Sequence, residues 1–201
     1  MANTQAQFGF KHIGFLPGFA PDYQLASFAI ASTNATQIGN GDPVTYANAT
    51  SAFIAQGSGA LATTAPIVGI FQGCTYIPSG GGAPVWSPYW PGAAAANATA
   101  YVINAPGAIF LVAALNTAIV STNIGNVVNF TTNTPSTVGG GFSVATIDQS
   151  TATTTGTTVS LLPFRIVSLY PGVGNGSDST TAYNWAVVAF NYQLNRSFVG
   201  S

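Results

Sequence analysis

The 201-residue sequence predicts an all-β fold, either a small β-barrel or β-tulip-like module or a sandwich, with long Gly, Ser and Thr loops. β-Branched and aromatic residues gather in short runs, which is typical of strands. Gly, Pro and Asn bound these runs at short intervals, as they do in sandwiches and barrels. Helix formers other than alanine are scarce, since the chain has only three Lys and Arg residues and no Glu. A chain of this length can bury a core without disulfides or a metal.

The first third of the chain predicts an arm, a turn and two strands. Residues 1–25 are predicted to form an extended N-terminal arm, and residues 26–201 a β domain. A division of that domain into two lobes near residues 92–100 stays open. In "GDPVTYA", residues 41–47, Asp42 before Pro43 predicts a turn that leads into a strand. In "APIVGIFQGCTYI", residues 65–77, Gly69 and Gly73 predict a bulged or sharply curved strand.

The remainder of the chain predicts more strands, two short helices and four loops. The expected strands cover residues 101–103, 109–112, 127–131, 142–147, 157–161, 164–170 and 184–192. Alanine-rich stretches predict helical turns over residues 92–101 and 112–125, the second ending at Gly125. Uncharged Gly, Ser and Thr stretches predict loops over residues 78–84, 133–141, 148–156 and 171–181.

The charge content limits the partners of this chain. Its formal charges are three Lys and Arg and four Asp, which give a net charge of −1. Nucleic-acid binding depends on several Lys and Arg contacts to phosphates, and anionic membranes need similar basic clusters. We therefore expect neither nucleic acid nor membrane as a partner. A surface with so little charge also favours association with other proteins.

The sequence gives no sign of a catalytic or metal centre. General acid–base catalysis needs titratable groups that meet in one pocket, and the chain has one His, one Cys and four separated Asp. We expect no enzyme activity, no cofactor and no metal. His12 is interpreted as an interface or surface residue, and Cys74 as a small buried apolar side chain. The N-terminus lacks the pattern of a secretory signal, and the apolar run at 105–120 is too short to span a membrane as a helix.

Two groups of aromatic residues suggest binding surfaces. The first lies in the predicted arm and consists of Phe8, Phe10, Phe15 and Phe19, and the second is Trp86, Tyr89 and Trp90 in "VWSPYWPG". A chain end is normally polar and frayed unless something holds it, so either this chain or another must cover the phenylalanines. Aromatic side chains dominate protein contacts, so the second group predicts an interface or a hairpin tip. Stacking of sugars on this second group is the alternative.

A set of segments in a fixed order links the chain to a known family. These segments are "MANTQAQFGF", "GDPV", "PIVGIFQGCTY", "PGAIFLV", "NIGNVVNF", "GFSVATID", "LLPFRIVSLYPG" and "NWAVVAFNYQLNR". Over nearly its whole length the chain resembles the head decoration, or cement, proteins of tailed bacteriophages. It departs from them in having almost no charge and in the segment "APVWSPYWPGAAAANA", residues 83–98.

The resemblance implies a non-enzymatic virion structural protein. Such proteins are made in the host cytoplasm and sit on the capsid exterior, where they bridge neighbouring capsomers and stabilise the head. It implies the major capsid protein as a partner and self-association into a homotrimer or other homo-oligomer. Both aromatic groups are then candidate contacts with the capsid or a neighbouring subunit. The alternative is a carbohydrate-binding or host-adhesion module of a virion or cell surface.

Overall fold

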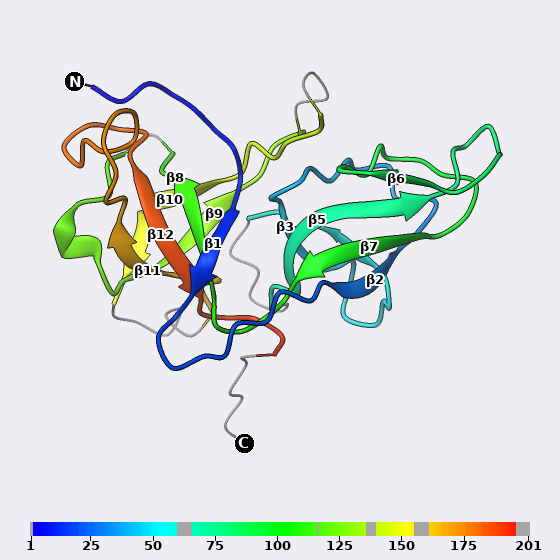
Figure 1. Cartoon of the computed structure of the whole chain (residues 1–201), viewed down its shortest axis with the longest axis horizontal. Helices are drawn as coiled ribbons and strands as arrows, with labels where there is room; N and C mark the ends of the chain where they lie inside the picture. Colours follow the sequence, from blue (N-terminus) through cyan, green and yellow to red (C-terminus); the bar gives the residue numbers. More distant parts are fainter. Residues whose placement is uncertain (1, 60–65, 116, 136–139, 155–160, 196–201) are drawn as a thin grey trace.

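The chain forms two antiparallel β-sheets that lie side by side (Figure 1). This computed structural model describes residues 2–59, 66–115, 117–135, 140–154 and 161–195. Within these ranges the protein is all-β, with one 3-10 turn (η1, Ser121–Asn123) and no α-helix. Neither sheet closes into a barrel, so the arrangement is sandwich-like. The predicted all-β class is confirmed, and a closed barrel is not what forms.

The first sheet lies at the left of Figure 1 and has six strands in the described part of the chain. In spatial order they are β1 (Lys11–Phe15), β8 (Ala108–Ala113), β12 (Trp185–Phe190), β11 (Phe164–Leu169), β9 (Val127–Thr131) and β10 (Thr146–Thr153). Strand β1 is therefore one edge of this sheet.

The second sheet lies at the right of Figure 1. Its spatial order is β2 (Ala26–Ile30), β7 (Ala98–Ile103), β5 (Gly69–Tyr76), β3 (Pro43–Tyr46) and β4 (Ile54–Gln56), and β6 (Val85–Ser87) also pairs with β5. The chain passes from β1 to β2 through residues 16–25, which we call the connector. It returns to the first sheet through residues 104–107, between β7 and β8. This return lies after β7, whereas the division into two lobes was considered near residues 92–100, where β7 begins.

Each sheet has its own hydrophobic core. The core of the first sheet consists of inward-facing side chains from its six strands or from the residues next to them, among them Phe110, Phe164 and Phe190. It also includes Ile70 of β5 and Ile103 of β7, so the two sheets are packed together at this point. The core of the second sheet contains the remaining inward residues of β2, β3, β4, β5 and β7 together with Ile38, Val68 and Trp90.

The apolar strand predictions agree well with the structure. Strands β9, β11 and β12 lie within the predicted ranges 127–131, 164–170 and 184–192, and β3 lies within 41–47. The predicted bulge in β5 is confirmed, because the register between β5 and β7 shifts between Phe71 and Gly73. Gly73 has a φ of 145°, and a Cβ there would collide with the Ser87 carbonyl of β6. Only glycine permits this backbone conformation and this close approach.

Three groups of predictions on secondary structure were wrong. The expected helix at 92–101 does not form: residues 92–97 are irregular, and β7 begins at Ala98, with Ala98, Ala100 and Val102 facing the core. At 112–125 the chain ends β8 and forms only η1, with residue 116 outside the described ranges. The expected loop at 148–156 is largely β10, while the run at 142–147 reaches strand conformation only at Thr146. The strand expected at 157–161 falls almost wholly outside the described residues.

The N-terminal arm was also wrong in part. Residues 11–15 form β1, which pairs with β8 and so belongs to the first sheet. The residues before β1 run along the first sheet toward β12 (Figure 1). Asn3 fixes them there: its side-chain amide donates to the Asp178 carbonyl at 2.7 Å and accepts from the Gly176 N–H at 2.9 Å. The chain thus holds its own N-terminal segment.

Candidate functional site

The four phenylalanines of the predicted arm have different surroundings. Phe10 is 1% exposed and lies in the core of the first sheet, where its ring stacks on Phe164 at a centroid distance of 4.4 Å. Phe8 and Phe15 are half-buried, and Phe8 meets Trp185 edge-on at 5.0 Å. Phe19 is 42% exposed. The prediction that another chain covers Phe10 is wrong, because its own chain covers it.

The connector presents apolar side chains on the surface. Residues 17–25 are exposed without interruption, and among them Tyr23 is 75% and Leu25 45% exposed. Ile13, on the neighbouring strand β1, is 48% exposed. One charge, that of Asp22, lies in this stretch. We refer to Ile13, Phe19, Tyr23 and Leu25 together as the connector surface.

The second aromatic group does not form one surface. Trp86 is 63% exposed on β6, whereas Trp90 is fully buried in the core of the second sheet. The Trp90 indole N–H donates to the Asn34 carbonyl at 2.9 Å, which satisfies its polar atom inside the core. Tyr89 is half-buried and packs over Gly141. Of the three residues, Trp86 alone remains well exposed, and the prediction of Trp90 as a contact residue is wrong.

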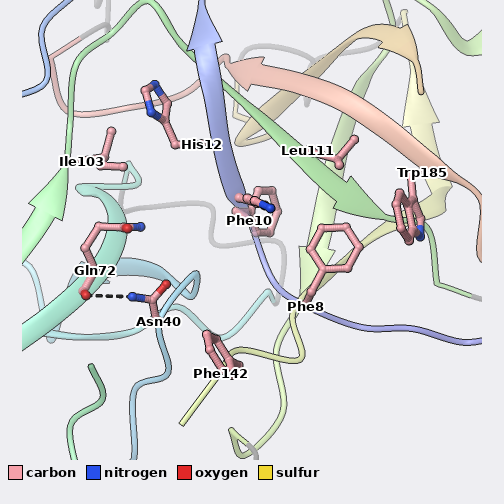
Figure 2. A pocket seen from close by; sticks show the side chains of 10 residues that line it. Phe8, Phe10, His12, Asn40, Gln72, Ile103, Leu111, Phe142 and Trp185 are labelled. Carbon is pink, nitrogen blue, oxygen red and sulfur yellow. Dashed lines mark hydrogen bonds between the residues drawn. The ribbon is translucent and has the colours of Figure 1, made fainter. Parts of the chain in front are cut away.

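A cleft of about 680 Å³ lies between the two sheets (Figure 2). Residues from both sheets and from the segments beside them line it: Phe8, Phe10, Lys11, His12, Asn40, Gln72, Ile103, Leu111, Phe142 and Trp185. Its size and its mostly apolar lining with a few polar groups are those of a small-molecule site. Asn40 and Phe142 reach it from two loops that are joined by a parallel bridge between these residues.

A buried aspartate holds the loops that border this cleft. Asp42 has no exposed surface, and its carboxylate accepts from the Gly39 N–H at 2.7 Å, the Gln56 amide at 2.8 Å and the Ser143 hydroxyl. The Asp42 N–H donates to the Gly39 carbonyl, so the turn predicted at this residue is confirmed. Asp42 thereby joins the loop before β3, strand β4 and the loop before β10.

Burial of Asp42 predicts a pH dependence of stability. Desolvation raises the pKa of this carboxyl above its ordinary value of 3.8, against the lowering effect of its hydrogen bonds to Ser143, Gly39 and Gln56. The folded state then holds the proton more tightly than the unfolded state. The contribution of Asp42 to the free energy of unfolding is therefore fully present below pH 3.8. It falls as the pH rises through the raised pKa of the folded state.

The change that isolates this contribution is Asp42→Asn. We expect the free energy of unfolding of the wild type, minus that of the variant, to fall with rising pH above 3.8 and then to level off. Urea unfolding at a series of pH values measures this difference. The subtraction also cancels Asp178, whose pKa is lowered by its hydrogen bonds to Thr180. A difference that rises with pH over this window would contradict the assignment.

The described residues show no assembled catalytic or metal centre. No group of three or more His, Cys, Asp or Glu comes together in them. His12 lies between the rings of Phe15, Tyr23 and Phe110 at centroid distances of 5.0 to 6.2 Å. Cys74 is free and buried, as predicted, and burial raises the pKa of its thiol to about 12. In the described ranges, no helix has the length and apolarity that crossing a membrane requires.

The connector surface was only weakly indicated by the sequence, and the cleft was not indicated at all. Tyr23 and Leu25 lie in "APDYQL", between a proline and the start of a strand. The isolated aromatic residue Tyr23 is the only feature of this segment that indicates a binding surface. Asn40, Gln72, Phe142 and Trp185 are far apart in the chain, so no local spacing connects them. Compared with protein-family models, curated proteins and solved structures, the chain matches none.

Proposed function

We propose that this chain is a non-enzymatic virion structural protein that binds the outside of a tailed-phage capsid, bridges neighbouring capsomers and stabilises the head. The ordered set of segments in the sequence supports this proposal through their resemblance to head decoration proteins. A β-tulip relationship and a homotrimeric state belong to the same proposal. The major capsid protein is the partner that the proposal names.

The connector surface is the structural observation that carries the proposal. Ile13, Phe19, Tyr23 and Leu25 are between 42% and 75% exposed on a chain whose formal charges number seven. The connector also runs between the two sheets along the lower side of Figure 1, so a partner that covers it contacts both parts of the molecule. A contiguous patch of exposed apolar side chains marks a protein contact, and the proposal takes these four side chains to form such a patch. It is here that we place the contact with the capsid.

The physical basis of stabilisation is linkage. A protein that binds the assembled shell, and not its disassembled subunits, raises the stability of the shell by mass action. Burial of one apolar side chain contributes about 1.5 to 3 kcal/mol. Because few ion pairs are available to this chain, we expect its binding to depend little on salt.

Substitutions in the connector test this assignment. We expect Tyr23→Ser and Leu25→Ser, made together, to weaken binding to undecorated heads by more than about tenfold, because a loss of about 1.4 kcal/mol already has that effect. Both side chains are exposed, so the free energy of unfolding should change little. Co-sedimentation with heads assembled without the protein, over a range of concentrations, measures the change.

Val173→Ser is the matched control. Val173 is 93% exposed in the loop between β11 and β12. This loop lies at the upper left of Figure 1, whereas the connector runs along the lower side. This variant should bind heads as the wild type does. Equal binding by the wild type and by the Tyr23 and Leu25 double variant would place the contact elsewhere, with Trp86 as the next residue to test.

The alternative of sugar stacking on Trp86, Tyr89 and Trp90 loses its structural basis. A stacking platform needs neighbouring exposed rings, whereas Trp90 is buried and Tyr89 packs over Gly141. Trp86 alone supplies one ring on a strand at the side of β5. We therefore do not place a glycan site there.

A further inference from the structure

We propose that the cleft between the two sheets binds an uncharged oligosaccharide. This proposal goes beyond capsid binding and does not depend on it, because the cleft and the connector surface consist of different residues. Its grounds are the aromatic rings, the amide groups and the charge of the lining.

Aromatic rings form one part of the lining. Phe8 and Trp185 contact each other edge-on at 5.0 Å, and Figure 2 shows them together on one side of the cleft. Phe142 lies at the lower edge of the view, beside Asn40, and is 55% exposed. Sugar rings have C–H faces that pack against aromatic rings. The exposed ring of Phe142 offers an aromatic surface for this packing, in the lining of a cleft of suitable size.

Two amide side chains supply hydrogen bonds. The Asn40 amide nitrogen donates to the Gln72 backbone carbonyl at 2.8 Å, and the Gln72 amide nitrogen donates to the Phe71 carbonyl at 3.2 Å. These bonds hold both side chains in place and leave the oxygen of each amide without a partner among the described residues. Neither oxygen is one of the fully buried unpaired atoms, so each keeps some exposed surface on a residue that lines the cleft. Hydroxyl groups are suitable donors to such acceptors.

The charge of the lining favours a neutral ligand. No carboxylate lines the cleft, and Lys11 is its one formally charged residue. A cationic ligand would have no counter-charge there and would be repelled by Lys11. An anionic ligand would find one exposed lysine, and an exposed ion pair contributes little.

The edge of β1 disfavours an added peptide strand as the occupant. The exposed Lys11 and the irregular register between His12 and Gly14 are features that obstruct strand pairing at an edge. The Phe10 N–H at the start of this edge already donates to the Gly41 carbonyl at 2.9 Å. A polyol binds through side-chain contacts and needs no backbone hydrogen bonds to a strand edge, so it fits the cleft better than a peptide strand does.

The experiment titrates the full chain with three neutral hexasaccharides, maltohexaose, cellohexaose and chitohexaose, by isothermal titration calorimetry. We expect at least one to bind, and Phe142→Ala to weaken that binding by about tenfold, the effect of about 1.4 kcal/mol. Gln72→Ala should weaken it as well. Trp86→Ala is the matched control, since it removes an exposed ring outside the cleft, and it should leave binding unchanged.

Several outcomes would overturn the proposal. One is that none of the three sugars binds at millimolar concentration, although a cooperative thermal unfolding transition shows that the chain is folded. Another is binding that survives Phe142→Ala and Gln72→Ala but is lost in Trp86→Ala. A third is tighter, salt-sensitive binding of an acidic oligosaccharide such as oligogalacturonate, which would identify an anion site at Lys11. Weaker head binding by Phe142→Ala without any sugar binding would assign the cleft to a protein partner.

Discussion

Replacing Phe10 with alanine is expected to lower the free energy of unfolding by about 3 to 5 kcal/mol, the range for a buried phenylalanine. Phe10 is 1% exposed and lies among the rings of Phe110, Phe130 and Phe164 at centroid distances of 4.4 to 6.4 Å. Its removal leaves a cavity at the centre of the first sheet's core. Urea unfolding of the purified variant, followed by tryptophan fluorescence, measures the loss.

Phe19→Ala is the control for this experiment. Phe19 lies in the same N-terminal region, but it is 42% exposed and packs on Gly107, so its truncation should lower stability by only about 1 to 2 kcal/mol. Similar small losses for both variants would mean that residues 8–15 are not part of the fold in solution. In that case the N-terminal segment would be free to act as an arm.

Asp42→Ala is expected to have the second large effect, a loss of about 3 kcal/mol. It removes the acceptor of the Gly39 N–H, the Gln56 amide and the Ser143 hydroxyl, and a buried donor left without a partner costs about 1 to 3 kcal/mol. The variant also releases the loops that carry Asn40 and Phe142. Equilibrium unfolding at neutral pH measures the loss, and sugar titration of the same variant tests the cleft.

The matched control is Asp22→Ala. Asp22 is exposed in the connector, where its carboxylate accepts one hydrogen bond, from the Gln24 N–H at 3.0 Å. Its removal should change stability by less than about 1 kcal/mol. If Asp42→Ala were as mild as this control, Asp42 would not be the residue that joins these three segments.

Strands that carry apolar runs between turn residues were predictable from the sequence. Val127 and Val128 in β9 and Val187 and Val188 in β12 show such runs, and both strands are buried on at least one face. Strand β1 was not predictable in this way, because Gly14 interrupts it and it depends on pairing with β8. Strand β10 was missed because its Ser and Thr residues resemble a loop, although threonine is β-branched and fits an edge.

The candidate sites were less predictable than the fold. Phe19 and Trp86, which clustering in the sequence marked as contact residues, are exposed, and their role as contacts stays a prediction. Clustering failed for Phe10 and Trp90, because contacts with residues far along the chain, Phe164 for Phe10 and Asn34 for Trp90, hold these rings in the two cores. The cleft escaped prediction because its lining residues come together only when the two sheets pack.

The measurement that tests the proposed capsid role most directly is sedimentation of the wild-type chain with undecorated phage heads, at low and at molar NaCl. We expect saturable, stoichiometric binding that persists at molar salt and raises the temperature at which the heads disrupt. A chain that stays in the supernatant at every concentration would contradict the proposed role. Binding that is lost at molar salt would contradict the apolar contact through the connector surface.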